Sequence, residues 1–281
     1  TPNSNDRPTS NLTFGASRAV YDSESSVAAY NTWMEDAQTA EDVESGFYLD
    51  YEIKDFKGYG RNSNLDVNLR VTMLNDADEV SLVSTTPQRI SQNAAIGNLE
   101  RFVVRRNASN SLFTAVYEPY KRDNRYVTDI QSVAIEATGG KAPGADDEAK
   151  AVKVVIGENR TDYIVYATNR DVVYTITDGD YSFNFSGFVG VWTVNADGEN
   201  TYSYLHDGTF IGDEKKKLES AEAAVTGKIV DFQKEFSLDN WIDVEFDREM
   251  DKEEVENLVD RMIIPEREKA GNSCYLIEGI K

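Results

Sequence analysis

Alternating apolar and polar residues dominate the central part of the chain. Apolar side chains occupy every second position of residues 65–73, which is the period of a strand with one buried face. Segments rich in β-branched and aromatic residues, bounded by Asn, Asp or Gly, predict further strands at Val80–Ser84, Arg101–Arg106, Leu112–Tyr117, Ala151–Ile156, Asp162–Thr168, Val172–Thr177 and Tyr181–Val194. The turn residues Asn195–Asn200 predict a hairpin to Thr201–Leu205. The pattern predicts an antiparallel all-β protein.

A first interruption of the strand pattern lies near the start of the chain. Ser23–Ala40 contains neither Gly nor Pro, and it places Val27, Tyr30 and Met34 at helical spacing. These features predict a short surface helix before the strands begin. Trp33 within this segment is a candidate for stacking on a sugar ring, and ordinary packing is the alternative role.

A second interruption separates the strands from the C-terminal part. Lys215–Val225 is first charged and then Ala-rich, as expected of a connection between domains. Beyond it, Gly227–Lys281 predicts two strands, a helix and a terminal strand, with Asp251 and Glu254 at capping-box spacing at the helix start. Three regions are therefore predicted: an N-terminal segment with a short helix (1–40), a large antiparallel β-sandwich (41–214), and a linker with a small C-terminal β-rich appendage (215–281).

Charge restricts the ligands that the chain can bind. Fifty acidic and 29 basic residues give a net charge of −21, which opposes nonspecific binding to nucleic acids or anionic membranes. No apolar run approaches the roughly 20 residues of a membrane span. Seven basic residues against three acidic ones give a local balance of +4 from residue 89 to 125; the basic ones are Arg89, Arg101, Arg105, Arg106, Lys121, Arg122 and Arg125. They form either a cationic strip for an anionic ligand or solvated strand residues paired with carboxylates.

Few residues offer recognisable catalytic or metal chemistry. His206 is the only histidine and Cys274 the only cysteine, so a His-pair metal site, a Cys-based zinc site and an intrachain disulfide are excluded. No nucleophile elbow, phosphate loop or dinucleotide fingerprint occurs. We interpret His206 as a surface residue close to a turn. No cofactor, no metal and no catalytic residue are predicted.

One stretch resembles a known family. It consists of Leu99-Glu-Arg-Phe-Val-Val-Arg-Arg-Asn107, then Ser111-Leu-Phe-Thr-Ala-Val-Tyr-Glu-Pro-Tyr120, then Ile130-Gln-Ser-Val133. The stretch resembles the C-terminal β region of heparinase II/III-type polysaccharide lyases and related alginate lyases. Within it, Glu118-Pro119 is interpreted as structural, because Pro fixes φ and ends a strand.

The resemblance implies a divided enzyme. Such lyases carry an (α/α) toroid followed by stacked antiparallel sheets, and they cleave uronic-acid polysaccharides by β-elimination with groups that come mainly from the toroid. Neither the toroid nor the family's Gly-Gly-x-x-His-like segment occurs in these residues. Because Thr1 is no start residue and Cys274–Lys281 ends as a strand, both ends are expected to be cut. This chain alone is then expected to be inactive, with Arg89 and Trp33 as candidate substrate contacts.

The resemblance also implies partners and a location. The expected partners are the N-terminal toroid portion of the same enzyme and an anionic polysaccharide such as alginate or a glycosaminoglycan; nucleic acid and membrane are not expected, and a homo-oligomer is left open. The expected location is extracellular or periplasmic. The alternative function is a non-catalytic carbohydrate-binding or structural β module.

Overall fold

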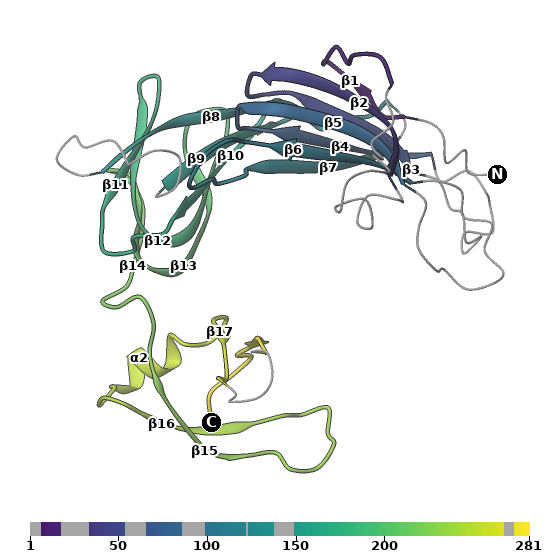
Figure 1. The fold of residues 1–281 in the computed structure, drawn as a ribbon. Coiled ribbons are helices and arrows are strands. Elements are labelled where there is room, and N and C mark those ends of the chain that lie inside the picture. Colours follow the sequence, from purple (N-terminus) through teal and green to yellow (C-terminus); the bar gives the residue numbers. More distant parts are fainter. Residues whose placement is uncertain are drawn as a thin grey trace. The chain divides into compact units, whose positions relative to one another are not determined.

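The computed structural model of the chain confirms an all-β fold (Figure 1). It describes residues 7–17, 34–53, 66–85, 99–121, 123–137, 149–266 and 273–281. Every strand pairing within these ranges is antiparallel. The chain divides into two compact units, Thr1–Ala221 and Glu222–Lys281, which we describe separately.

The first unit begins with a two-layer sandwich. One sheet has the order β1 (Thr9–Ser10), β3 (Tyr48–Ile53), β4 (Val67–Met73), β7 (Ala115–Lys121); the other has the order β2 (Met34–Val43), β5 (Ala77–Thr85), β6 (Leu99–Arg105). Side chains from both sheets share one core, in which Leu49, Val71, Val80 and Leu82 are at most 2% exposed. Burial of these apolar side chains is what holds the two layers together.

Strand β2 corrects the last part of the helix predicted over Ser23–Ala40, and residues 23–33 of that segment lie outside the described residues. Residues 34–40 of that segment belong to β2, which pairs with β5 with a register shift between Glu35 and Gln38. Positive φ angles at Asp36 and Asp42 interrupt the alternation of sides along the strand. The prediction failed there because a strand interrupted by such residues loses its period of two.

The rest of the first unit is a seven-stranded sheet. Its order is β10 (Arg160–Ala167), β9 (Ala149–Ile156), β8 (Val127–Ala137), β11 (Tyr174–Asp178), β12 (Tyr181–Val194), β13 (Asn200–Gly212), β14 (Lys217–Glu219). Strand β12 pairs with β11 through residues 181–185 and with β10 through residues 189–194. The strands β8 to β12 therefore form a closed circuit of hydrogen-bonded neighbours. The first unit is thus built around two successive large cores, and the predicted division at residues 41 and 214 stays a prediction.

Aromatic side chains fill the closed sheet. Trp192 and Phe185 are 0% exposed, and Phe183 stacks on Trp192 with ring centroids 5.9 Å apart. The polar atoms of the core aromatics have partners, since the Trp192 Nε1–H donates to the Tyr181 hydroxyl at 2.7 Å and the Tyr163 hydroxyl donates to Asp178 at 2.7 Å. Because these polar groups have hydrogen-bond partners inside the core, the core is a rigid support for the outer face of the sheet.

A third apolar cluster joins the sandwich to the closed sheet. Leu74, at the end of β4, packs with Val152 and Val154 of β9, and Val116 of β7 contacts the same cluster. The Lys150 ammonium also donates to the Leu74 carbonyl at 3.3 Å. The outer face of β9 is therefore covered by the sandwich.

The second unit contains short elements. They are β15 (Gly227–Phe232), β16 (Ile242–Phe246), α2 (Lys252–Glu256), β17 (Met262–Ile263) and β18 (Tyr275–Leu276). The predicted capping box is present, with the Asp251 carboxylate accepting from the Glu254 N–H at 2.9 Å. The helix has five residues, and Met262, which follows it in β17, is exposed. Within the described ranges, no helix is long and apolar enough to cross a membrane.

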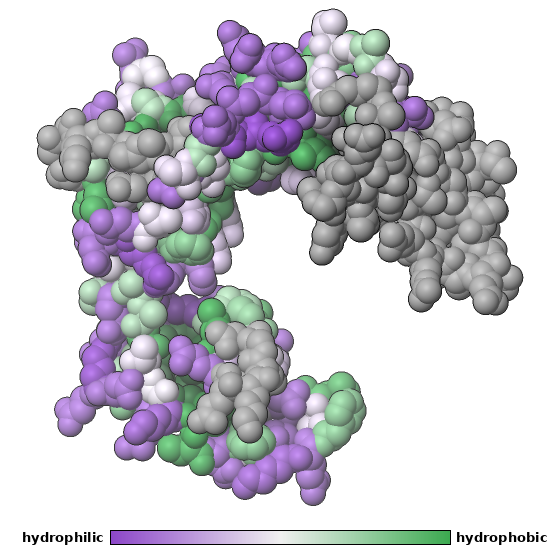
Figure 2. Space-filling model, in the orientation of Figure 1, coloured by the Kyte–Doolittle hydropathy of each residue, from purple (hydrophilic) through white to green (hydrophobic). Residues whose placement is uncertain are grey.

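The second unit exposes much of its apolar surface. Phe236 and Leu238, in the connection between β15 and β16, are almost fully exposed, and Val230 and Phe232 of β15 are more than half exposed. Hydrophobic atoms accordingly reach the surface of this unit (Figure 2). The buried apolar residues found in the described part of the chain all lie at or before Ile211. The large hydrophobic cores therefore belong to the first unit.

Candidate functional site

The two substrate contacts predicted from the sequence, Trp33 and Arg89, lie outside the described residues. Their role stays a prediction. The predicted basic strip is partly described and is distributed over different sheets. Arg105 of β6 pairs with Glu79 at 3.6 Å, and Arg125, which precedes β8, pairs with Glu118 of β7 at 2.6 Å. For these two arginines the structure favours ion pairing with neighbouring carboxylates.

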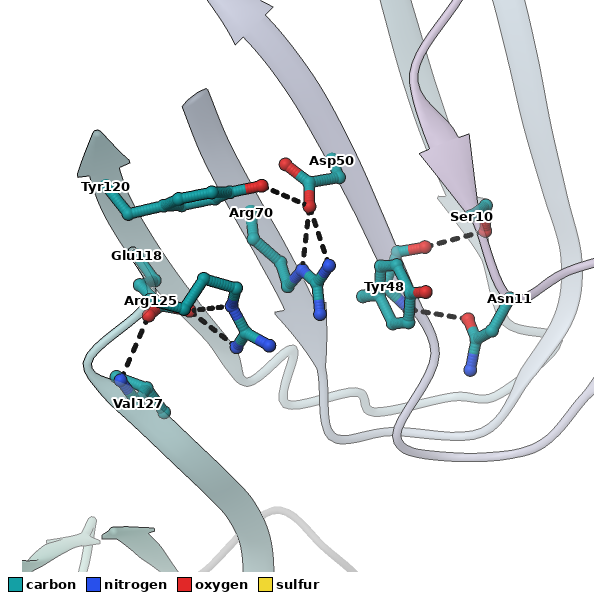
Figure 3. A network of polar contacts seen from close by, with 9 residues as sticks. All are labelled: Ser10, Asn11, Tyr48, Asp50, Arg70, Glu118, Tyr120, Arg125 and Val127. Atoms are coloured by element: carbon teal, nitrogen blue, oxygen red, sulfur yellow. Dashed lines mark hydrogen bonds and ion pairs between the residues drawn. The ribbon is translucent and has the colours of Figure 1, made fainter. Parts of the chain in front are cut away.

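The strand that carries the Glu-Pro-Tyr motif takes part in a polar network on the outer face of the first sheet (Figure 3). Arg70 of β4 donates from Nε and Nη2 to one oxygen of Asp50 at 2.9 and 2.7 Å, and it lies 3.9 Å from the Tyr48 ring centroid. The Tyr120 hydroxyl donates to the same Asp50 oxygen at 2.6 Å. Burial, together with this hydrogen bond, raises the pKa of Tyr120 to about 12. All charges of this network are paired within it.

Glu118 has a structural role in this motif, in agreement with the interpretation from the sequence. Its buried carboxylate accepts from Arg125 Nε at 2.9 Å and Nη2 at 2.6 Å, and from the Val127 N–H at 3.1 Å (Figure 3). Pro119 does not end the strand as expected, because β7 continues to Lys121. It lies in an edge strand of the sheet, where a missing N–H costs least. The motif fixes the passage from β7 to β8.

A second set of polar and aromatic side chains lies on the outer face of β10, β12 and β13, where Asp162 and Thr193 are buried and Ile164 packs against the third apolar cluster. Tyr163, Val165 and Trp192 point into the core, so the residues between them point outward. Three cross-strand rows result: Tyr166, Val189 and His206; Ile164, Val191 and Tyr204; Asp162, Thr193 and Tyr202. Tyr204 and Tyr202 are 39% and 54% exposed. Strand β13 thus presents two tyrosines and a histidine on one face.

A bulge shapes one end of this surface. The pairing of β12 with β13 shifts register between Ser186 and Gly187, and Asp207 opposite has a positive φ of 47°. Gly187 and Gly208 meet backbone to backbone there, because a Cβ on Gly208 would lie 2.6 Å from the Gly187 Cα. Bulges of this kind bend a strand and redirect its side chains, and they are frequent beside functional sites.

The bulge brings five side chains together: Tyr166, Arg170, Phe188, His206 and Asp207, which we call the bulge cluster. Phe188 lies with its ring centroid 5.1 Å from that of Tyr166 and 6.2 Å from that of His206, both in edge-to-face geometry. Arg170 comes from the loop between β10 and β11, pairs with Asp207, and lies 5.7 Å from the Phe188 ring centroid. The cluster therefore combines a cation, an imidazole and aromatic rings on one surface.

The position of His206 corrects the sequence interpretation. It was expected at the surface close to a turn, but β13 continues to Gly212, and His206 is a half-buried residue in the middle of this strand. No hydrogen bond joins its ring to another described residue. The sequence signal that could have found this site is the spacing of two between Tyr202, Tyr204 and His206, which indicates one shared face.

The cluster has the chemistry of a carbohydrate contact. Aromatic faces bury the apolar C–H faces of sugar rings, and a guanidinium binds carboxylate in a planar fork. Among the described residues, no group of three or more His, Cys, Asp or Glu side chains is arranged to hold a metal ion. The arrangement therefore suits binding of an anionic sugar chain.

Comparison with known families found one match over part of the chain. One family model matches residues 142–230, a range that contains β9 to β14 and the whole bulge cluster. The model describes a C-terminal domain of a polysaccharide lyase, so the class predicted from the sequence is confirmed at this level. By its full description it is the endo-acting ulvan lyase C-terminal domain. The closer resemblance to heparinase II/III-type and alginate lyases stays a prediction. No curated protein and no solved structure matches the chain.

Proposed function

We propose that this chain is the C-terminal part of a polysaccharide lyase that cleaves a uronate-containing polysaccharide by β-elimination. Ulvan is the proposed substrate, since the matching family model is named for endo-acting ulvan lyases. Eliminative cleavage requires a uronic acid, because the carboxyl group makes the C5 proton acidic enough to be removed. The match over residues 142–230 is the observation that carries the proposal.

The proposed role of the chain is binding of the polymer. The single cation of the bulge cluster, Arg170, is already paired with Asp207, so the pair has no net charge. An ion pair without net charge is better suited to holding a sugar chain than to neutralising the uronate carboxylate while its C5 proton is removed. A catalytic (α/α) toroid on another part of the enzyme would then supply the base and the acid, with Trp33 and Arg89 as further candidate contacts. The proposed location is extracellular or periplasmic, where such a polymer is met.

The test uses the purified 281-residue chain and soluble ulvan. We expect binding in titration calorimetry, weakening with added salt, and no rise in ultraviolet absorbance from an unsaturated product. Addition of a helical portion of the same enzyme is expected to produce that absorbance. An unsaturated product formed by the chain alone would contradict the division of roles. Absence of binding to ulvan would contradict the binding role.

A further inference from the structure

We propose that Arg170 is the residue that selects uronate over neutral sugars, by presenting the Nε–Nη2 edge of its guanidinium to the uronate carboxylate. This inference rests on the proposed function and specifies the ligand group at the bulge cluster. The relevant observation is that Arg170 is bonded differently from Arg70, Arg125 and Arg160 of the same unit. Arg105 also pairs through Nη1, with Glu79 at 3.6 Å, but it lies in β6 outside the bulge cluster.

Three other arginines of this unit have fully engaged guanidinium edges. Arg70, Arg125 and Arg160 each donate from both Nε and Nη2 to a carboxylate. Each of these carboxylates also has a second donor: Tyr120 for Asp50, the Val127 N–H for Glu118, and Thr193 for Asp162. These pairs are closed and offer no edge to a ligand.

Arg170 has an open edge. Among the described residues its guanidinium donates through Nη1 alone, to Asp207, and the Asp207 carboxylate accepts from no other described residue. The Arg170 side chain is 51% exposed. The Nε–Nη2 edge, which matches a carboxylate in bidentate geometry, is therefore available to a ligand.

The surroundings hold Arg170 in place. The Ser186 hydroxyl donates to the Arg170 carbonyl at 3.0 Å, and Ser186 is only 4% exposed. Phe188 lies to one side of the guanidinium, and Asp207 is fixed by the bulge backbone. A guanidinium oriented in advance loses less conformational freedom on binding, which favours recognition of a carboxylate.

The partner switch of β12 explains why this site occurs here. The pairing of β12 with β11 ends at Phe185 and its pairing with β10 begins at Val189. The loop that carries Arg170 joins β10 to β11 and is bonded to β12 at Ser186, between these two pairings. The side chains of the bulge cluster therefore meet where the ladder on this edge of β12 is interrupted.

The test compares ulvan with carboxyl-reduced ulvan, in which uronates are converted to neutral sugars, using the full chain. Arg170→Lys keeps the charge but removes the fork, and Arg170→Gln removes both. We expect each variant to bind ulvan about tenfold more weakly or worse, the glutamine variant most, because a charged hydrogen-bonded pair is lost. Wild type, Arg170→Lys and Arg170→Gln should bind carboxyl-reduced ulvan with equal affinity. That affinity should be lower than the affinity of wild type for ulvan.

Arg160→Gln is the matched control. It removes a guanidinium from β10, the strand that precedes the Arg170 loop, but one whose Nε–Nη2 edge is closed by Asp162, so binding should stay within about twofold of wild type. The inference is overturned if Arg170→Lys binds like wild type, if Arg160→Gln loses as much, or if the loss is equal on carboxyl-reduced ulvan. If wild type binds neither polymer, the proposed function fails as well; if it binds both equally, only this inference fails.

Discussion

The carboxylate of Glu118 lies 2.6 Å from Nη2 of Arg125 and is only 6% exposed. Because Glu118 lies in β7, the last strand of the sandwich, and Arg125 precedes β8 of the closed sheet, this pair connects two parts of the first unit that have separate hydrophobic cores. The contribution of this pair to the free energy of unfolding can be measured without a binding or activity assay.

Replacement of Glu118 by Gln should therefore destabilise the first unit. The amide keeps the shape but leaves Arg125 without its counter-charge, so we expect a loss of about 1–3 kcal/mol in the free energy of unfolding. Urea denaturation followed by fluorescence measures it. Glu219→Gln is the control, since its ion pair with Lys217 is solvent-exposed and its loss should cost less than about 0.5 kcal/mol. Equal losses in the two variants would contradict the structural role of Glu118.

Gly208 should tolerate no side chain. A Cβ there would lie 2.6 Å from two backbone atoms, Gly187 Cα and the Ser186 carbonyl oxygen, so the two strands would have to separate. We expect Gly208→Ala to lower the free energy of unfolding by about 2 kcal/mol or more. Gly15→Ala is the comparison, because its Cβ would meet only one atom, at 3.4 Å. A Gly208→Ala protein as stable as wild type would show that the close approach of the two strands is not required.

A feature of the structure could be predicted from the sequence when it depends on residues close together in the chain. The capping box at Asp251 and Glu254 was found because it depends on residues three apart. The period of two in β4 revealed a half-buried strand in the same way. The partner switch of β12 and the bulge at Gly187 depend on strands distant in sequence, so the position of Arg170 beside Phe188 could not be predicted. Residue-by-residue patterns found many of the strands, but not β2, β3 or β8, and not the closure of the sheet.

Alkaline pH should destabilise the first unit through two partly buried tyrosines. Burial and a hydrogen bond to Asp50 raise the pKa of Tyr120 to about 12, and burial likewise raises the pKa of Tyr181 to about 12, with Asp213 adding to the effect. An unfolded tyrosine loses its proton near pH 10, so the unfolded state binds fewer protons between about pH 10 and pH 12. Stability is then fully present below about pH 10 and falls as the pH rises toward 12.

Denaturation midpoints measured from about pH 8 to about pH 11 would test this dependence. Tyr120→Phe should be less stable at neutral pH, because a hydrogen bond to Asp50 is lost, but its stability should fall less steeply above pH 10. Tyr126→Phe serves as the control, since Tyr126 is 72% exposed. An identical slope in wild type and Tyr120→Phe would rule out Tyr120 as a source of the alkaline loss.

The first unit should fold without the second. The buried apolar residues of the described chain lie at or before Ile211, and the two units separate between Ala221 and Glu222. A chain that ends at Ala221 should therefore keep the main calorimetric transition within a few degrees, and it should keep affinity for ulvan because the bulge cluster is intact. Loss of the transition would show that the first unit depends on residues 222–281.

Tyr204 should contribute to polymer binding through its ring. It lies one cross-strand row from the bulge cluster and is 39% exposed, so a sugar bound at Arg170 has an aromatic surface beside it on β13. Removing one stacking ring should cost about 1–2 kcal/mol, which is roughly a tenfold loss of affinity for Tyr204→Ala. Unlike the Arg170 variants, Tyr204→Ala should weaken binding of ulvan and carboxyl-reduced ulvan alike, because stacking uses C–H faces rather than charge. Tyr126→Ala, which removes a more exposed ring that precedes β8 and is not part of β10, β12 or β13, should bind both polymers like wild type. A loss restricted to the charged polymer would mean that Tyr204 acts through Arg170 instead of through stacking.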